Sequence, residues 1–423
     1  MQCTIEIFDK GKWQKCCIVK AEDASAGRNC PSILMFDRNW PANAKPAPSL
    51  RYSPQSDPLE LSSWPSFLLD LIPQGAGRKH LVEELNLPDD PRSDWSLLLT
   101  GAICPIGRIR VREAAAGFEA RMRELDPKLV SQGFTTQEVL SRSEAFAEYF
   151  EAHGFLSAGA TSVQGTTPKL LLTQGRDDLW YADAALPDEK AAKHYILKFS
   201  RARNLADWHI LRNEAAYMQL AKEMGLFVEE PPEWRNEMLF VPRFDRKVTQ
   251  NGVMRYHQES LASLAGLTDP STPVSHFSVL ETLRQYVHDP FTDTLEYIRR
   301  DIMNLALGNP DNCPFNTAVQ TVNGMMRLSP LYDFAPMYLD MDEMERSIQW
   351  LDENGNVLTN WADVLRALPL ESYEKDALRT GLRTFGEKMK NIEPLMEKFA
   401  AGHDIMTDRY YGIQNQRWQL REL

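Results

Sequence analysis

Residues 308–334, GNPDNCPFNTAVQTVNGMMRLSPLYDF, hold side chains whose types and spacing could bind a metal ion. Asp311, Asn316 and Asp333 all offer oxygen atoms to a ligand. A hard cation such as Mg²⁺ prefers oxygen ligands, also when the ion holds the phosphates of a nucleotide. The three residues are therefore candidates for one metal and phosphate site.

A hairpin is predicted to bring these residues together. Asn323-Gly324 favours a two-residue turn, because both central residues of that turn need a positive φ angle. The flanking segments, 317–322 and 325–329, are the predicted strands. Because a hairpin returns the chain to its start, the oxygen-bearing residues on its two sides would lie close together.

The same residues follow an order that is typical of phosphoryl-transfer enzymes. An Asp-x4-Asn spacing, then a hairpin, then an Asp before an aromatic residue matches a protein-kinase catalytic loop and its metal-binding loop. An ordinary polar loop capped by Asn and Asp is the alternative interpretation of this stretch by itself.

Composition limits the classes of protein that fit. The 423 residues allow two or three domains or lobes, and a net charge of −12 argues against direct binding of nucleic acid. That charge leaves room for a local basic patch or for DNA contact through a partner. Six cysteines without zinc-like spacing favour free thiols in a reducing compartment. With no secretory signal and no apolar run of membrane-spanning length, the sequence predicts a cytoplasmic protein without membrane contact.

Three regions with different patterns are predicted to position the candidate site. Residues 1–113 mix short strands and helices, which predicts an α+β N-terminal module. Residues 114–250 begin as a helical linker and continue as strands, which predicts a β-rich nucleotide-binding lobe. Helical spacing in residues 251–423 predicts an all-helical catalytic C-terminal lobe, with the hairpin at the seam between the two lobes.

A lysine inside an apolar strand is a further candidate. Lys198 lies in the run 195–199, where a lysine could sit at a sheet edge and discourage aggregation. It could instead lie on a central strand, contact ATP phosphates and pair with a glutamate of a helix. Glu214, in the predicted helix 206–225, could be that glutamate or a salt-bridge residue at the helix boundary.

The segment before that strand could bind phosphate. Residues 157–172, SAGATSVQGTTPKLLL, are small, hydroxyl-bearing and glycine-containing, and they precede an apolar strand. Backbone N–H groups in such a loop can hold phosphate, although most loops with this composition do not.

Taken together, residues 31–336 resemble the HipA-like serine/threonine kinases, the toxin component of bacterial HipBA-type toxin–antitoxin systems. Seven segments carry the resemblance, in the order and at the spacing of the family: SVQGTTPKLLL, YILKFS, NEAAYMQLAKEMGL, VPRFDR, YHQES, GNPDNCPFN and LSPLYDF. They look like the phosphate loop, ATP-lysine strand, following helix, hinge strand, post-hinge segment, catalytic loop and metal loop. The resemblance implies an α+β, two-lobed protein-kinase-like fold.

The resemblance also implies roles for individual residues in phosphoryl transfer that depends on Mg²⁺ and ATP. Asp311 would be the catalytic base, Lys198 would contact the ATP phosphates, and Asn316 and Asp333 would hold Mg²⁺. Further nucleotide contacts are implied for the phosphate loop, the hinge backbone and two other positions, namely Ser162, Val163, Gln164, Arg243, Phe244, Gln258 and Tyr332.

The sequence departs from the family pattern at several positions. Cys313 and Phe315 stand where a His and a Lys are usual, so the catalytic loop lacks a positive charge. Pro242 replaces a hinge position that is often acidic, and Ser162 stands where the phosphate loop usually has Gly. Length and the divergent loop are more similar to the HipH-type branch. The candidate acceptors for autophosphorylation are Ser157, Thr161 and Ser162.

The family resemblance implies two partners, a protein substrate such as an aminoacyl-tRNA synthetase and a DNA-binding, HipB-like antitoxin. Three functions stay open at this point. One is an active serine/threonine kinase that inhibits translation. The second is a pseudokinase or ATP-binding interaction module, which the altered catalytic loop favours. The third is a small-molecule kinase, against which the N-terminal module argues.

Overall fold

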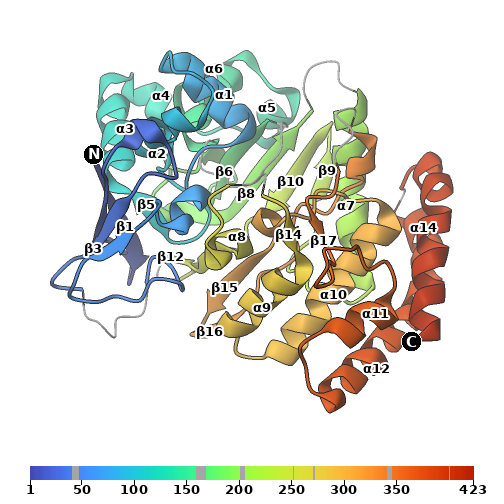
Figure 1. Ribbon diagram of the computed structural model, residues 1–423. Helices are drawn as coiled ribbons and strands as arrows, with labels where there is room; N and C mark the ends of the chain where they lie inside the picture. Colours follow the sequence, from blue (N-terminus) through green and yellow to red (C-terminus); the bar gives the residue numbers. More distant parts are fainter. Residues whose placement is uncertain are drawn as a thin grey trace.

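The computed structural model describes most of the chain, namely residues 1–40, 47–158, 168–200, 205–250, 252–269, 272–340, 345–399 and 401–423. Figure 1 shows an N-terminal module in blue, a second sheet in green and a mainly helical region in orange and red. Within the described residues, no helix is long and apolar enough to cross a membrane.

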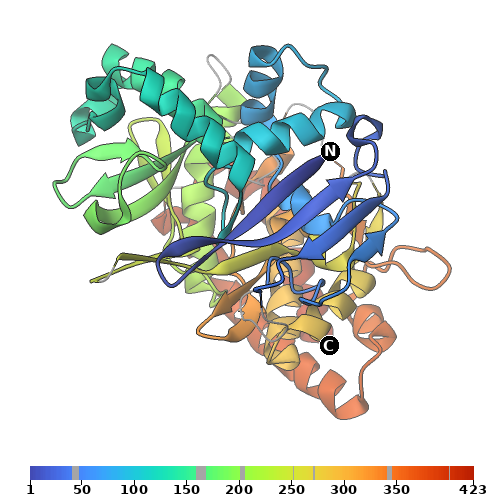
Figure 2. The ribbon, with the colours of Figure 1, turned by 90° about the vertical axis from the view of Figure 1, so that its left-hand side faces the viewer.

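The N-terminal module is built on a five-stranded sheet with the order β4-β3-β2-β1-β5. Figure 2 views this sheet from its own side of the molecule. Three helices, α1, α2 and α3, pack with it around buried aromatic side chains, among them Trp64 and Trp95, whose rings lie 4.9 Å apart. The bounds are β1 Gln2–Asp9, β2 Lys12–Ala21, β3 Ser32–Phe36, β4 Leu59–Leu61, α1 Gly75–Glu84, α2 Asp94–Gly101, β5 Ile109–Val111 and α3 Arg112–Glu124.

The second sheet has the order β7-β6-β8-β10-β9, so β8 is its central strand. Helices α5 and α6 cover one face through Val139, Phe146 and Tyr149, and α7 covers the other face through Leu211. The bounds are α4 Pro127–Ser131, α5 Thr136–Ser141, α6 Glu144–Ala158, β6 Lys169–Gly175, β7 Trp180–Ala182, β8 Ala191–Phe199, α7 Leu205–Glu223, β9 Glu233–Arg235 and β10 Met238–Pro242.

The sequence predicted an all-helical C-terminal lobe, and this prediction is wrong. Besides its helices, the C-terminal region contains a three-stranded sheet, β13-β15-β16, and the two-stranded pair β14-β17. These strands are only two to five residues long, too short for a reliable periodic pattern, and apart from the β15–β16 hairpin they pair with segments far apart in sequence. The strand bounds are β11 Arg246–Thr249, β12 Gly252–Arg255, β13 His257–Ser260, β14 Val274–Ser275, β15 Ala318–Val322, β16 Met325–Leu328 and β17 Ile348–Gln349.

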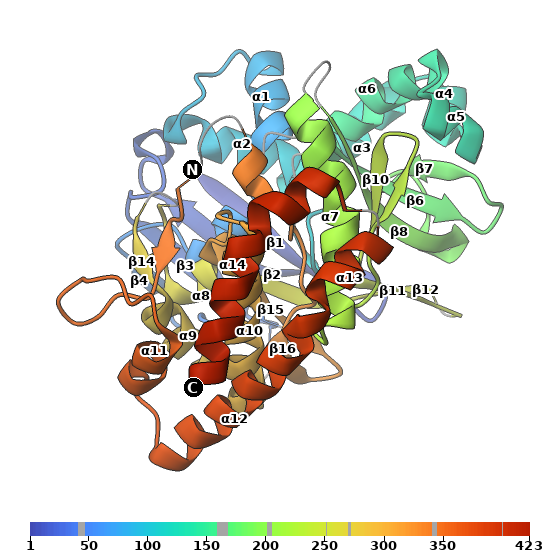
Figure 3. The ribbon, with the colours of Figure 1, turned by 90° about the vertical axis from the view of Figure 1, so that its right-hand side faces the viewer.

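The helices of this region share one large core that also includes the second half of α7. The last helix, α14, packs against α10 and α12, as Figure 3 shows. The helix bounds are α8 Leu261–Ala265, α9 His276–Tyr286, α10 Pro290–Leu307, α11 Trp361–Ala367, α12 Ser372–Lys388, α13 Ile392–Lys398 and α14 His403–Glu422.

The predicted hairpin is confirmed. Strands β15 and β16 are joined by Asn323 and Gly324, whose φ angles are 52° and 80°. Strand β15 also pairs with β13, so the hairpin is fixed to the segment that follows the second sheet. The boundaries expected at residues 113 and 250 remain a proposal, because the core of the N-terminal module also includes side chains of α8 and of the catalytic loop.

Candidate active site

The site is built around a lysine of the central strand β8. Leu197 packs on the face covered by α6, so the next residue, Lys198, points to the face covered by α7. There its Nζ lies 2.7 Å and 3.0 Å from the two carboxylate oxygens of Glu214. Both side chains are buried. The lysine is therefore on a central strand and paired with a helix glutamate, and the edge-strand alternative is excluded.

Asp333 joins this pair from the far side of the hairpin. Its carboxylate forms an ion pair with Lys198, and its Oδ2 lies 3.9 Å from Nζ of Lys169. Lys169 stands directly opposite Lys198 in the β6–β8 ladder, so two lysines on neighbouring strands face one aspartate. The φ angle of Asp333 is 52°, a left-handed conformation that is uncommon outside glycine. Such a conformation is held by its surroundings and is frequent at functional sites.

Burial and neighbouring charges alter the pKa values of these groups. Burial alone would lower the pKa of Lys198, but the charges of Asp333 and Glu214 more than offset it and raise the pKa. For Lys169 burial prevails and lowers the pKa to about 8, although Asp333 opposes this effect. Two buried lysines with the same neighbours therefore have pKa values displaced in opposite directions.

Asp311 and Asn316 lie in the loop between α10 and β15. The Nδ2 of Asn316 donates to the backbone carbonyl of Asp311 at 2.9 Å, which closes the loop on itself. Burial, followed by the negative charge of Asp333, raises the pKa of the Asp311 carboxyl to about 6. The structure thus brings together all four residues predicted for catalysis and metal binding.

The same residues offer a set of oxygen atoms that suits Mg²⁺. The Oδ1 of Asn316 is buried and has no hydrogen-bond partner in the structure. Buried polar atoms are almost always satisfied, so an orphaned oxygen beside a carboxylate indicates a missing partner such as a cation. In the described residues no group of three or more His, Cys, Asp or Glu side chains could hold a metal ion.

A buried aspartate of α10 anchors the catalytic loop. Asp301 accepts a hydrogen bond from Nδ2 of Asn312 at 2.6 Å and from the indole of Trp350 at 2.8 Å. Arg346 pairs with the same carboxylate. Our sequence analysis missed this anchor, although an aspartate inside the buried stripe of a helix is a signal that could have revealed it.

Cys313 and Phe315, the two loop positions that depart from the family pattern, are buried. Both belong to the hydrophobic core of the N-terminal module, together with Ala262 of α8. The loop therefore uses these positions for apolar contacts with the N-terminal module, where a polar His and Lys would be usual.

The segment predicted to be the hinge lies after β10. The N–H of Arg243 donates to the carbonyl of His194 at 2.9 Å, and the carbonyl of Phe244 accepts from Gln320 at 3.1 Å. A backbone contact with adenine would therefore use the Arg243 carbonyl or the Phe244 N–H. The rings of Phe244 and Tyr332 lie 5.9 Å apart, so these two predicted nucleotide contacts are neighbours across the seam.

The side chain of Arg243 does not point to a nucleotide but into a buried charge cluster. Its guanidinium lies 2.6 Å from Asp245 and 3.3 Å from Asp183, and Arg246 lies 2.8 Å from Asp183. These ion pairs fix the hinge to the end of β7. Sequence analysis did not identify this cluster, because its members come from separate segments.

The remaining predicted contacts are placed as follows. Gln258 lies on β13 opposite Gln320, and its buried Oε1 has no hydrogen-bond partner, which leaves it available to a ligand. Ser162, Val163 and Gln164 of the phosphate loop, and also Thr161, lie outside the described residues.

This geometry defines a two-lobed, kinase-like α+β protein, with a lysine–glutamate pair in one lobe and the loop of Asp311 and Asn316 beside the other. Residues 161–396 match the family described as the HipA-like C-terminal domain, which is more than half of the chain. The chain belongs to this family.

This chain is similar to several known proteins. A Sinorhizobium fredii protein named "Putative kinase Y4mE" is 32% identical over 161 residues, which are 36% of this chain and only 37% of that protein. A solved structure of the Shewanella oneidensis MR-1 toxin–antitoxin complex of HipA, HipB and operator DNA aligns with a TM-score of 0.64 and 17% identity. This alignment covers 99% of this chain and 96% of that chain, and it confirms the predicted fold. The Helicobacter pylori proinflammatory kinase CtkA aligns with a TM-score of 0.39 and 13% identity over 62% of this chain and 90% of that chain.

Proposed function

We propose that this chain is a protein serine/threonine kinase that depends on Mg²⁺ and ATP and acts in the cytoplasm as the toxin of a toxin–antitoxin pair. The observation that carries the proposal is the convergence of Lys198, Glu214 and Asp333 beside Asp311 and Asn316. Phosphoryl transfer requires positioning and charge neutralisation more than covalent chemistry, and these residues can provide both.

In this mechanism the lysines bind the phosphates. Lys198, held by Glu214, would neutralise the α- and β-phosphates, and Lys169 would add a second positive charge from the neighbouring strand. Asn316 and Asp333 would hold Mg²⁺, which neutralises the charge that develops on the transferred phosphoryl group. Nucleotide binding would then replace the present ion pair between Lys198 and Asp333.

Asp311 would orient the hydroxyl of the acceptor and accept its proton. A raised pKa of about 6 leaves this carboxyl mostly ionised at neutral pH while bringing its basicity closer to the working pH. The contact between Asn312 and Asp301 would hold the loop, and therefore the base, at a fixed position.

A second function, a pseudokinase or nucleotide-binding interaction module, is favoured by one observation. Cys313 and Phe315 are buried against the N-terminal module, so the catalytic loop offers no cation of its own at these positions. Lys169 supports the active kinase instead, because it supplies a positive charge beside Asp333 from another strand.

The partners are proposed from the family. The alignment with the HipA chain of a complex that also contains HipB and operator DNA supports a DNA-binding, HipB-like antitoxin as partner. With a net charge of −12, the chain would depend on that partner for contact with DNA. A protein of the translation machinery, such as an aminoacyl-tRNA synthetase, is the proposed substrate.

The test is the intact mass of the purified chain after incubation with ATP and Mg²⁺. We expect the wild type to gain one or more phosphates, and the Asp311→Ala variant to gain none while it still binds nucleotide. Asp57→Ala, at an exposed aspartate, is the matched control and should behave as the wild type.

Peptide mapping would then locate the acceptor among Ser157, Thr161 and Ser162. Nucleotide binding without transfer to the chain or to any protein acceptor would favour the pseudokinase. A chain that binds no nucleotide at all would contradict both functions.

A further inference from the structure

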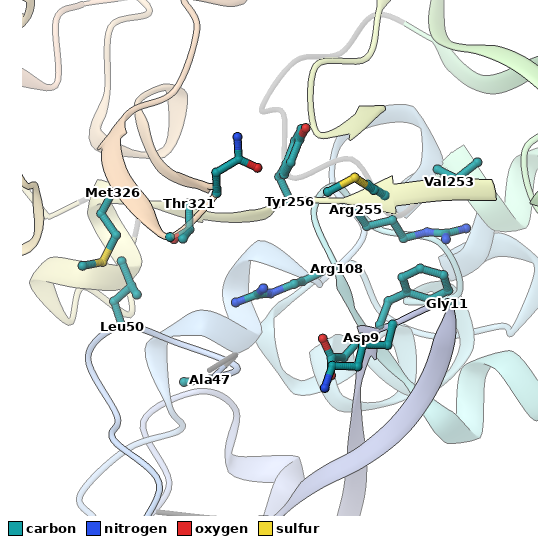
Figure 4. A pocket seen from close by; sticks show the side chains of 15 residues that line it. Asp9, Gly11, Ala47, Leu50, Arg108, Val253, Arg255, Tyr256, Thr321 and Met326 are labelled. Carbon is teal, nitrogen blue, oxygen red and sulfur yellow. The ribbon is translucent and has the colours of Figure 1, made fainter. Parts of the chain in front are cut away.

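A cavity of about 550 Å³ lies between the N-terminal module and the hairpin, away from the residues of the candidate active site. Its walls come from the turn between β1 and β2, from β12, from the β15–β16 hairpin and from the segments around Leu50 and Arg108. In Figure 4 the Arg108 side chain extends between Leu50 and Thr321 on one side and Asp9 on the other. The cavity shares no residue with the Lys198, Asp311 and Asp333 cluster.

Arg108 is the unusual member of this cavity. Its Nε is buried and has no hydrogen-bond partner, and among the described residues no carboxylate forms an ion pair with its guanidinium. Burial lowers the pKa of Arg108 to about 10, and the more distant charge of Asp9 offsets this only in part. Arg108 is half-buried, and a buried polar atom such as its Nε is costly without a partner, so its presence needs a reason other than stability.

The other charges of the cavity do not supply that partner. Arg255 is held by Asp188 at 2.6 Å and 2.9 Å and lies over the ring of Phe8 at 4.0 Å. Lys10 adds another positive charge, and Asp9 is the one carboxylate among the lining residues. The described lining therefore carries three cations and one anion, which favours a negatively charged occupant.

Apolar groups make up much of the remaining wall. Phe8, Leu50, Val253 and Met326 line the cavity, and Met254 at its edge is 44% exposed although its side chain is large and apolar. The volume lies in the range of about 300–1,000 Å³ that is usual for small-molecule sites. A cation aimed into an apolar cavity of this size fits a ligand that joins one anionic group to an apolar body.

We propose that this cavity binds a small anionic molecule whose phosphate or carboxylate group pairs with Arg108 and whose apolar or aromatic part contacts Phe8, Leu50 and Met326. A guanidinium binds either group through two parallel hydrogen bonds. One wall is the hairpin whose first strand begins just after Asn316 and whose second strand leads to Asp333, so the ligand would contact the element that positions both proposed metal ligands. The proposal does not depend on the chain being a kinase.

Calorimetric titration of the full chain tests this site, with phenyl phosphate, benzoate and inorganic phosphate as probes. We expect phenyl phosphate or benzoate to bind the wild type, and inorganic phosphate to bind at least tenfold more weakly because it lacks the apolar part. Phenyl phosphate preferred over benzoate would identify a phosphate ligand, and the reverse order a carboxylate. If neither aromatic probe binds, the proposal is overturned.

Variants of the chain show where the probe binds. Arg108→Gln should weaken binding at least tenfold, and Arg108→Lys should weaken it less because the charge remains. Arg366→Gln makes the same change at a side chain that is 76% exposed, and it should bind as the wild type does. Lys198→Met should also leave this binding unchanged while it weakens ATP binding, which separates the two sites. Equal affinity in the wild type and Arg108→Gln would contradict the proposal.

A thermal unfolding experiment gives an independent readout. Because the Nε of Arg108 is buried without a hydrogen-bond partner, Arg108→Met should melt at the same or a higher temperature than the wild type in the absence of probe, and it should lose the upward shift that the probe gives the wild type. A structural arginine would behave differently, since its replacement would lower the melting temperature. A clear fall in melting temperature of Arg108→Met would overturn the proposal.

Discussion

Two groups of buried charges lie on the same face of strand β8 and differ in how their charges are paired. His194 belongs to the group at the hinge, and Lys198 belongs to the group at the candidate site. The two residues are four positions apart on β8, which corresponds to about 13 Å along a strand. In the hinge group each guanidinium of Arg243 and Arg246 has an aspartate within 3 Å. In the site group Asn316 Oδ1 has no partner, and Lys198 and Lys169 both face Asp333.

The difference is the one expected between a structural cluster and a catalytic one. The arginines of the hinge hold the pKa of Asp183 well below its ordinary value despite burial, so they stabilise its charged form. At the site the pKa of Asp311 is raised to about 6 and that of Lys169 is lowered to about 8, which brings both groups close to neutral pH. Titratable groups whose pKa values move towards the working pH are typical of catalysis, and fully paired ones are typical of a scaffold.

Breaking the hinge cluster should produce the largest loss of stability. Asp183→Ala leaves Arg243 and Arg246 buried with one carboxylate fewer, and removing one partner of a buried ion pair costs about 3–5 kcal/mol. Urea unfolding should therefore show a lower free energy of unfolding by about that amount. Asp188→Ala removes the partner of Arg255 at a more exposed carboxylate and should cost less. Equal losses in both variants would contradict the structural role of the hinge cluster.

Asp311→Asn should have the opposite effect, with little loss of stability and a large loss of activity. We expect the phosphorylation rate to fall by roughly 10²- to 10⁴-fold, the range for removal of a general base. The wild-type rate should rise with pH around an apparent pKa near 6, the value expected for this carboxyl. A wild-type rate that does not change between pH 5 and 7 would argue against Asp311 as the base.

The same variant also tests the pKa of Asp311 through the pH dependence of the free energy of unfolding. The folded pKa of Asp311 is raised above its unfolded value, so the folded state binds more protons between about pH 4 and 6. The contribution of this carboxyl to stability is thus present at low pH and is lost as the pH rises through 6. As the pH rises from about 4 to 6, Asp311→Asn should therefore gain stability relative to the wild type. Measurements of the free energy of unfolding at several pH values test this.

The anchor of the catalytic loop should have a smaller effect. Asn312→Ala removes the hydrogen bond to Asp301 but leaves the contacts of Asp301 with Arg346 and Trp350 in place. The turnover rate should fall roughly 10-fold because the base is less well positioned, with the KM for ATP unchanged. Asn354→Ala, at an exposed turn, is the control. A change in KM alone would show that Asn312 acts on nucleotide binding instead.

The smallest expected effect concerns Lys169. Because burial lowers its pKa to about 8, the lysine loses its charge above that pH, and nucleotide affinity should fall several-fold between pH 7 and 9. An arginine stays charged throughout this range, so Lys169→Arg should remove the decline. Fluorescence titration with a nucleotide analogue measures this affinity at each pH, and Lys193→Arg is the control. If Lys169→Arg shows the same decline in nucleotide affinity, the decline comes from the titration of another group.

Local signals in the sequence predicted much of the scaffold. The Asn-Gly pair located the hairpin because its turn needs two positive φ angles, and these angles are observed. The helical spacing of α7, α10 and α12 located long helices, whose amphipathic pattern is strong over many residues. The short strands β13, β14 and β17 were missed, since two to four residues carry no periodic signal and form only by pairing with distant segments.

The candidate site was predictable in part for the same reason. Asp311, Asn316 and Asp333 lie on one short stretch around a hairpin, so their proximity followed from local geometry. The contribution of Lys169, the anchor at Asp301 and the charge cluster around Asp183 depends on strands and helices far apart in sequence. Residue types alone do not indicate such pairings.

The sequence by itself determined which groups could do chemistry on this chain and the order in which they occur, because turn residues and hydrophobic periods act locally. Only the tertiary structure decided which charges are paired and which are not. It places an aspartate beside each hinge arginine, leaves an oxygen of Asn316 unsatisfied and leaves the buried Nε of Arg108 without a hydrogen-bond partner. Pairing depends on distance and desolvation between segments, which are fixed only when the sheets and helices pack together.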